Sequence, residues 1–499
     1  MASYTKGNGK INDFLVNVQI FFVVVLNKDL SFFSAVYGLK DLLNLTFWNI
    51  MSTSNAGTEQ QGFLKTLGLH RKELRAWAMY DWANSAFATV MMASILPIYY
   101  HDVAASNLAE HDRTAYWGYT TGFALLIIAL AAPALGAIAD SMGARKKFLK
   151  WFMACGVIGS GCMYFIGQGD WLLASLLFVI GNIGFAGGNI FYDALLPSVA
   201  KKDELDRVST AGFAMGYVGG GLLLAINLAW ILKPDFFGIP DKGMAVRLSL
   251  FSVAVWWLLF SIPLFKHVRE PERIQLHTDL GSAFNVAFGR LVNTFKQIRR
   301  FKHIMVFLVG FWFYSDGVGT IIKMATIYGR EIGIESNHLI GALLLVQFVG
   351  IPATFAFGAI ANKIGTKPAM IITLLVYTFI CVLGYFMNTA WHFWALSILV
   401  ALVQGGCQAL SRSMYATIVP ASKSSEFFSF FSVSSKFAGI FGPILFAIVS
   451  QLTGGSRFSI LFLISFFAIG IVMLLKLDLD KARQFAEEYE LEIMASRRV

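Results

Sequence analysis

The sequence predicts an all-α membrane protein whose twelve transmembrane helices form two pseudo-symmetric bundles of six. Three observations predict this fold. Of the 499 residues, 57% are hydrophobic and only 14% are charged, which is more apolar surface than a soluble chain of this length can bury. Apolar windows of about 20 residues, long enough to cross a bilayer, recur along the chain. The segment GAIADSMGARK at 136–146 also recurs as GAIANKIGTKP at 358–368. One copy of this turn in each half indicates a duplicated six-span unit.

Each expected span is a helix, because lipid offers no other hydrogen-bonding partner to the backbone of a single segment. The first six spans are expected at residues 78–100, 116–139, 148–167, 171–195, 209–232 and 246–266. The second six are expected at residues 303–327, 337–361, 367–388, 391–414, 426–451 and 458–477. The repeated turn follows the second span in the first half and the eighth span in the second half.

The basic residues indicate the orientation. Most Lys and Arg side chains outside the spans fall in segments on the same side as the N-terminus, including Arg145, Lys146 and the stretch 267–302. The positive-inside rule therefore places both termini and the repeated turn in the cytoplasm. The net charge of +10 does not indicate a nucleic-acid partner, because the charges lie in short loops between apolar runs.

The expected domains follow from the spans. The two bundles cover residues 68–266 and 303–478, and residues 479–499 form a cytoplasmic tail. The linker at 267–302 carries apolar residues at helical spacing beside basic ones, which predicts an amphipathic helix on the inner membrane face. A partner-binding role for this helix is the alternative. Residues 1–67 are expected to be a poorly ordered extension. We hypothesise that translation starts at Met51, so that residues 1–50 are not functional.

Polar residues inside the first and fourth spans are the first candidate solute or ion contacts. A charge in the centre of a span costs about 2.5–3.5 kcal/mol on insertion scales, so each one needs a reason. Asp81 and Asn84 lie three residues apart on one helical face, and Asn189 and Asp193 align on one stripe of the fourth span. Asp81 could instead cap its helix or pair with Arg75. The asparagine could serve only helix packing, and Asp193 could serve a gate.

The second half offers a matching set. Asp316 and Lys323 share one face of the seventh span, about 10 Å apart by helix rise, so each is expected to meet a partner on another helix or a solute. A structural ion pair is the alternative. Gln404 and Gln408 are one turn apart in the tenth span and suit solute contact or helix packing equally. Lys436 in the eleventh span is expected to have a carboxylate partner such as Asp316 or Asp193.

Other classes of protein lack support in the sequence. There is no phosphate-binding loop, no nucleophile elbow and no zinc-ligand spacing. We therefore expect no enzyme activity, no cofactor and no bound metal. An energised version of this protein would depend on an ion gradient, with a proton or sodium as the co-transported ion.

The repeated turn resembles the signature between the second and third spans of major facilitator transporters, in which an acid and basic residues control the inner gate. The positions that match are Gly136, Asp140, Gly143, Arg145 and Lys146. The second copy has Asn362 where the first has Asp140, and Thr366-Lys367 where the first has a basic pair. The resemblance implies a weaker charge lock in the second half. Arg412, near the inner end of the tenth span, is also expected at this gate.

Four further blocks resemble the family of vacuolar amino-acid effluxers linked to autophagy and their bacterial relatives. They are WAMYDWANSAF at 77–87, FYDALLP at 191–197, DGVGTII at 316–322 and QGGCQALSR at 404–412. The resemblance covers about residues 68–478 and implies the major facilitator fold with amino-acid efflux as an activity. The compact loops are more similar to the bacterial branch, which implies the bacterial inner membrane.

The expected function is secondary transport of a small polar solute by alternating access, with the two bundles rocking around a central cavity. Neutral amino acids are the leading solute class, and coupling to protons would use Asp81, Asp193 or Asp316. Transport of a sugar, peptide or drug is the first alternative. A non-transporting receptor or scaffold on this fold is the second. The protein is expected to be a monomer, with the lipid bilayer and the solute as its partners.

Overall fold

The computed structural model describes residues 64–65, 69–141, 145–201, 205–269, 289, 296, 301–419, 427, 431, 434–435 and 437–496. The chain divides into two units, residues 1–70 and 71–499. In the first unit, the described residues include a hydrogen bond from the Leu69 amide to the Leu64 carbonyl at 2.8 Å. The predicted extension at 1–67 and the predicted linker helix lie almost entirely outside the described residues. Everything below concerns the second unit.

The first span is not one regular helix. It runs through α5 (Lys72–Ala86), the π-helix η2 (Phe87–Ser94) and α6 (Ile95–Tyr99), and the short π-helix η3 (Tyr100–Ala104) follows its end. Pro97 explains part of this irregularity, because proline has no amide N–H to donate to the carbonyl four residues earlier. That carbonyl belongs to Ala93, inside η2. The irregular stretch therefore lies where the sequence removes a helix hydrogen bond.

The rest of the first half is regular. Its helices are α7 (Glu110–Ser141), α8 (Arg145–Cys162) followed by the 3-10 turn η4 (Met163–Phe165), α9 (Trp171–Val199), α10 (Leu205–Leu232), the 3-10 turn η5 (Pro234–Phe237) and α11 (Lys242–His267). Asp241 begins α11 by accepting the Met244 amide at 2.8 Å, as expected of an acidic N-cap.

The second half repeats the pattern. Its helices are α13 (Lys302–Glu331), α14 (Ser336–Ile364), α15 (Thr366–Tyr385), α16 (Ala390–Ile418), α18 (Phe441–Thr453) and α19 (Arg457–Lys476), and α20 (Leu479–Ser496) follows them. A helix overlaps each of the twelve predicted spans. Among the described residues, nine helices are long and apolar enough to cross a membrane. The predicted fold class is confirmed.

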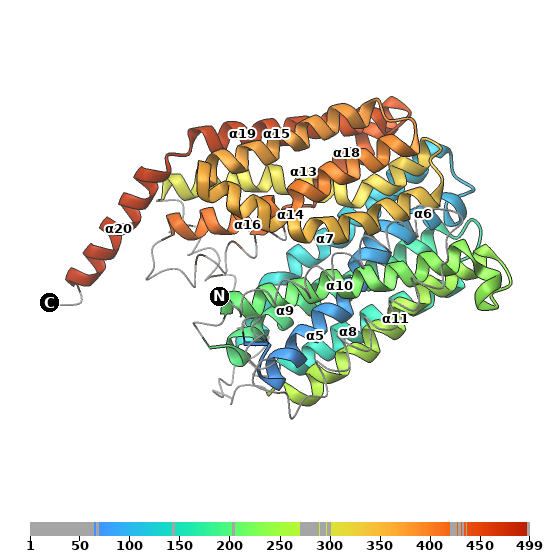
Figure 1. The fold of residues 1–499 in the computed structure, drawn as a ribbon, viewed down its shortest axis with the longest axis horizontal. Coiled ribbons are helices and arrows are strands. Elements are labelled where there is room, and N and C mark those ends of the chain that lie inside the picture. Colours follow the sequence, from blue (N-terminus) through green and yellow to red (C-terminus); the bar gives the residue numbers. More distant parts are fainter. Residues whose placement is uncertain are drawn as a thin grey trace, which may run out of the picture. The chain divides into compact units, whose positions relative to one another are not determined.

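The helices form two bundles within this unit. In Figure 1, α13, α15, α16 and α19 lie on one side, and α5, α8, α9 and α11 lie on the other. Contact between the bundles is made chiefly where α7 packs on α18 and α10 packs on α14. Large apolar side chains remain exposed on the outer helices, for example Trp151 and Phe379. An apolar outer surface is what a bundle surrounded by lipid requires.

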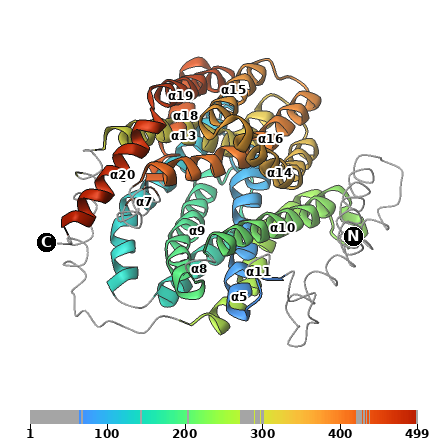
Figure 2. The ribbon, with the colours of Figure 1, turned by 60° about the vertical axis from the view of Figure 1, so that its left-hand side comes forward.

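The two ends of the bundles are called the repeat end and the far end. The repeat end holds the ends of α7 and α14 and the starts of α8 and α15, where the repeated turn lies. The far end holds the opposite ends, including Ala104, Glu110 and Glu331. At the repeat end α20 packs against α13 and α16, and Figure 2 shows it continuing beyond α19. The sequence predicts that the repeat end faces the cytoplasm.

Candidate functional site

The polar residues predicted in the first and fourth spans meet each other. The Tyr192 hydroxyl of α9 donates to Asp81 Oδ2 of α5 at 2.9 Å, and Asn84 Nδ2 donates to Asn189 Oδ1 at 2.6 Å. Two direct bonds therefore join α5 to α9, in the part of α9 that is nearer the repeat end. The sequence placed these residues on two faces, and the structure shows that the faces are opposed.

Aromatic rings and glycines surround this pair of bonds. The Trp77 and Tyr192 rings stack at 4.4 Å, and the Trp77 indole donates to the Tyr192 carbonyl at 3.2 Å. Gly212 of α10 lies so close that a Cβ there would be 2.5 Å from Asp81 Oδ2. The glycine-rich helix α10, which forms the fifth span, thus closes one side of Asp81. The carboxylate is held by α5, α9 and α10 together.

Asp193 and Asn182 extend this polar stripe along α9. Asp193 is exposed, and its charge acts on Asp81. Asn182 is 1% exposed, and among the described residues neither of its amide atoms has a hydrogen-bond partner. A buried amide without partners is costly, so a water or a solute is the natural partner for it.

In the second half, Asp316 and Lys323 do not pair with each other. The ion pairs within 4.0 Å among the described residues do not include one between them. Asp316 accepts the Gly442 amide with both carboxylate oxygens, at 3.0 and 2.9 Å. Lys323 Nζ lies 3.4 Å from the Gly439 carbonyl oxygen. Both side chains of α13 thus bind the backbone at the start of α18, on another helix, as one of the sequence-based alternatives predicted.

A cavity of about 100 Å³ lies between α13, α14 and α16, and Ala93 of the first span forms part of its wall. Its lining is mainly apolar, including Ile321, Val346 and Phe393. The amides of Gln347 and Gln404 supply polar groups. Of the two glutamines predicted in the tenth span, Gln404 lines this cavity and Gln408 is exposed.

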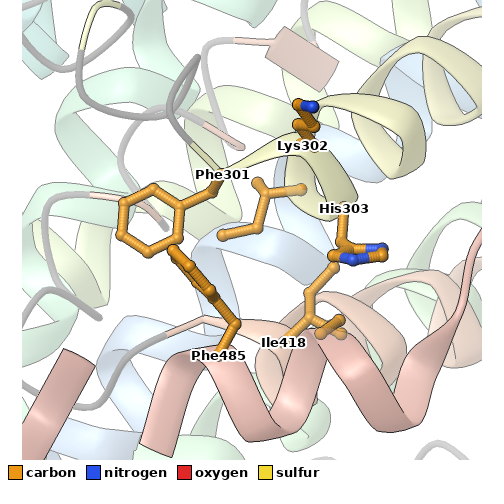
Figure 3. Close-up of a pocket in the computed structure, with 7 residues that line it drawn as sticks. Phe301, Lys302, His303, Ile418 and Phe485 are labelled. Carbon is orange, nitrogen blue, oxygen red and sulfur yellow. The ribbon is translucent and has the colours of Figure 1, made fainter. Parts of the chain in front are cut away.

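A second cavity, of about 230 Å³, lies at the repeat end where α20 meets the start of α13. Figure 3 shows the Phe301 and Phe485 rings on one side of it and His303 and Ile418 on another. The two rings meet edge to face at 5.3 Å. The described residues that line it include none of those predicted from the sequence as solute contacts.

Polar contacts between the two halves close the far end. Arg330 Nε of α13 lies 2.7 Å from both carboxylate oxygens of Asp102, two residues beyond the predicted first span. Gln451 of α18 donates to Asp112 at 2.9 Å and accepts from the Tyr119 hydroxyl at 2.6 Å. Burial acts to raise the pKa of Asp102, but hydrogen bonds and charge from His101 and Arg330 outweigh it. The pKa of this carboxyl is therefore below its usual range.

The irregular first span contributes another contact between the halves. Thr326 Oγ1 of α13 donates to the Ala93 carbonyl at 2.8 Å, and Thr326 is fully buried. This is the carbonyl that Pro97 leaves without its helix donor. A local break in one half is thus satisfied by a side chain from the other half.

The lysines of the repeated turn have equivalent contacts. Lys146 Nζ donates to the Phe265 and Val268 carbonyls at the end of α11, at 2.9 and 2.7 Å. Lys367 Nζ donates to the Leu475 and Leu477 carbonyls at the end of α19, at 3.2 and 2.7 Å. Each lysine therefore binds the last helix of its own half. A cation there also complements the negative end of that helix.

The other predicted gate residues are described only in part. Gly136 and Asp140 lie in α7, but their side chains are outside the described residues, as are Gly143 and Lys436 altogether. Arg145 begins α8. The exposed Arg412 guanidinium lies 5.6 Å from the centre of the Phe213 ring of α10, so it meets the other half.

The comparisons with known proteins show the family of this chain. The family model described as vacuole effluxer Atg22 like matches residues 107–487. The chain belongs to this family. The Atg22-like assignment also confirms the resemblance found in the four sequence blocks.

Relatives of this Atg22-like protein span most of its length. The MFS-type transporter YxiO of Bacillus subtilis (strain 168) is 41% identical over 405 residues, which cover 81% of this chain and 94% of the relative. Autophagy-related protein 22 of Yarrowia lipolytica (strain CLIB 122 / E 150) is 23% identical over 467 residues, covering 76% of this chain and 78% of the relative. The chain is therefore a multi-pass membrane protein of a transporter family.

Solved structures show the same fold as this Atg22-like chain. A D-xylose-proton symporter superposes with a TM-score of 0.60 at 16% identity, over 81% of this chain and 96% of the symporter. A bacterial homologue of the human lysosomal transporter Spinster, inward-facing and unoccupied, gives 0.58 at 15% identity, over 86% and 99%. At such identity these likenesses show the major facilitator fold alone.

Several residues of the site have no clear sequence signal. Asp102 and Arg330 resemble ordinary loop charges, and Thr326 resembles an ordinary helix residue. Pro97 is the one signal that could have indicated a free carbonyl at Ala93. Tyr192 stands next to a predicted residue, and its hydroxyl is the direct partner of Asp81.

Proposed function

We propose that this protein is a secondary transporter that moves a small polar solute, with amino acids as the leading class, by alternating access. The observation that carries the proposal is the closure between the halves at the far end, made by Arg330 on Asp102 and by Thr326 on the Ala93 carbonyl. Polar contacts of this kind can form and break as two rigid bundles rock. A chain that served only as a scaffold would have no need of a separable contact there.

The proposed solute contacts lie on the first, fourth and tenth spans. Asp81, Asn84, Asn189 and Asp193 offer charge and hydrogen bonds from the first half. Gln404 offers an amide from the second half, at a cavity whose other walls are mainly apolar. An amino acid has a charged backbone end and, in many cases, an apolar side chain, and both kinds of surface are present. The names of the effluxer family and of the autophagy-related relative support the same class.

Orientation and coupling complete the proposal. We infer that the repeat end faces the cytoplasm of a bacterial cell, that the halves at 68–266 and 303–478 move about the linker at 267–302, and that the net direction is efflux. A proton is the proposed coupling ion, with Asp81 or Asp193 as its carrier, and sodium is the alternative. The protein is proposed to act as a monomer.

The test is flux of labelled amino acids in proteoliposomes, with and without a pH gradient. Wild type is compared with Asp81→Asn, which removes the titrating group, and with Asp235→Asn, an exposed acid in η5. We expect saturable flux in wild type and in the control, and loss of the response to the gradient in Asp81→Asn. Absence of any amino-acid flux in wild type would refute the solute class. An unchanged gradient response in Asp81→Asn would leave the proton to another group.

A further inference from the structure

The eleventh span is broken near its middle. Gly439 has φ of +115°, in the region that favours glycine, and α18 begins two residues later at Phe441. The Ala438 amide still donates to the Ser434 carbonyl at 2.9 Å, which belongs to the helix before the break. A break inside a membrane leaves amides and carbonyls that need partners from other parts of the protein.

Two charged side chains of the seventh span are the partners of the backbone groups at the break, and each has the charge that suits its partner. Asp316, which is 4% exposed, accepts the Gly442 amide in the first turn of α18. Lys323, which is 9% exposed, lies against the Gly439 carbonyl before that turn. A carboxylate suits the positive N-terminus of a helix, and an ammonium suits a free carbonyl. Asp316 and Lys323 together hold both sides of the break.

The fit at Gly442 leaves no room for a side chain. A Cβ at this position would collide with the Thr320 hydroxyl and would lie 2.6 Å from Asp316 Oδ1. Thr320 cannot turn away freely, because its hydroxyl donates to the Asp316 carbonyl at 2.7 Å. Close contact between α13 and α18 therefore depends on the glycine.

The other half packs on the same place. A Cβ at Gly118 of α7 would lie 2.7 Å from the Pro443 carbonyl, and a Cβ at Gly122 would lie 3.3 Å from the Ile440 carbonyl. The buried Trp117 indole of α7 donates to the Lys323 carbonyl at 3.3 Å. The second span thus rests on backbone immediately before and after Gly442.

We propose that Asp316 and Lys323 are positioning residues, which fix the break in the eleventh span so that it forms a rigid surface on which the second span moves. The inference rests on the proposed alternating access, since a surface of this kind matters only if the halves move. In this role Asp316 acts as a hydrogen-bond acceptor for α18. It does not carry the solute or the proton.

If Asp316 serves as a hydrogen-bond acceptor, its substitution by asparagine and its substitution by alanine should have different effects. Asp316→Asn keeps an oxygen that can accept the Gly442 amide, because asparagine caps helices about as well as aspartate. Asp316→Ala removes the acceptor, and Gly442→Ala forces the helices apart. Gly319→Ala on α13 is the matched control, because its new methyl group would meet nothing closer than Lys323 Nζ at 3.6 Å.

The experiment measures distance and flux in the same variants. Spin labels are placed on cysteines at the exposed positions 110 and 452, at the far ends of α7 and α18, after replacement of Cys155, Cys162, Cys381 and Cys407. We expect a narrow distance distribution for the parent, Gly319→Ala and Asp316→Asn, with flux within about threefold of the parent for these variants. Asp316→Ala and Gly442→Ala should broaden the distribution and lower flux about tenfold or more.

Two results would overturn the proposal. The first is a narrow distribution in both Asp316→Ala and Gly442→Ala. The second is loss of gradient-driven flux in Asp316→Asn while its distribution stays narrow, which would make Asp316 a proton or solute group. If Asp316→Ala does not fold, Lys323→Met takes its place in the comparison. The distance measurement needs no solute, so it decides the inference even if the parent transports none of the amino acids tested.

Discussion

Arg330 and Asp102 join the two halves of the protein at the far end, with Arg330 Nε 2.7 Å from both carboxylate oxygens. The two residues are 228 positions apart, and each lies just beyond the predicted first span of its half. Both side chains are more than two-thirds buried, so solvent screens this ion pair less than a surface pair. This ion pair between Arg330 and Asp102, called the latch below, can stabilise the state in which the far end is closed.

Removing the latch should favour opening of the far end. We expect Asp102→Ala to shift the equilibrium by about 1–3 kcal/mol, because it leaves a partly buried guanidinium without its carboxylate. The measurement is the rate of thiol labelling at a cysteine placed at Ala93. Asp235→Ala, an exposed acid at the same end, serves as the control and should leave the rate unchanged. Equal labelling of Asp102→Ala and wild type would show that the latch does not hold the closed state.

The same contact predicts a pH dependence with a definite sign. The pKa of Asp102 is below its usual range in the closed state, so the closed state is stabilised while the carboxylate is ionised. This stabilisation is present in full above the pKa of about 3.9 of a free aspartate, and it is lost as pH falls through the lower value. The labelling rate at position 93, divided by that of a fully exposed cysteine because the thiolate is the reactive form, should therefore be flat from about pH 5 to 8 and should rise only in stronger acid. A rise confined to the range near pH 6.5 would show that a group other than Asp102 controls the opening.

Thr326→Val tests the hydrogen bond to the Ala93 carbonyl. Valine keeps the shape of threonine but leaves the carbonyl that Pro97 has freed without a donor, at a cost of about 1–3 kcal/mol. We expect a lower midpoint of thermal unfolding in detergent and faster labelling at the far end. The control is Thr378→Val, because among the described residues its hydroxyl bonds to Leu374 alone, within its own helix. An equal effect from both substitutions would mean that the contact between the halves has no special role.

Lys146 and Lys367 should contribute similar stability, because each binds two carbonyls at the end of the last helix of its half. Substitution of either by Met keeps the apolar stem and removes the ammonium, and we expect a loss of about 1 kcal/mol in the free energy of unfolding. Lys147→Met and Lys363→Met are controls, since both side chains are exposed in the same turns. A loss seen for Lys146 alone would contradict the equivalence.

Asp140 and its counterpart Asn362 should contribute differently to transport, although the two lysines should contribute similar stability. Asp140 has a charge and its counterpart Asn362 has none, so a charge lock at the repeat end can form fully only in the first half. We expect Asp140→Asn to lower the transport rate and Asn362→Ala to change it little. The measurement is initial flux at equal protein amounts in proteoliposomes. Similar losses in both variants would show that the halves gate alike.

Sequence reasoning predicted what each segment does on its own. Apolar length identifies the spans, and spacing within a helix shows that Asp81 and Asn84 share one face. Neither can show which helix faces which, because that choice depends on packing between distant segments. The sequence therefore could not predict that Tyr192 is the partner of Asp81, or that the Gly442 amide is the partner of Asp316.

The alignment of the repeated turn illustrates the same limit. Matching the two segments by sequence places Arg145 opposite Lys367. In the structure Lys146 is the second residue of α8 and Lys367 is the second residue of α15, and these two make the equivalent contacts. The first copy thus has one more residue before its helix begins. A sequence comparison cannot detect this shift, because the basic residues of the first copy are adjacent.

The most direct test of alternating access is a reversible lock on the latch. Cysteines replace Asp102 and Arg330 in a background without the four native cysteines, and a short cleavable thiol cross-linker joins them. Flux of labelled amino acids into proteoliposomes is then measured before and after cleavage. We predict that the cross-linked protein is inactive and that cleavage restores flux. Full flux through completely cross-linked protein would contradict the account.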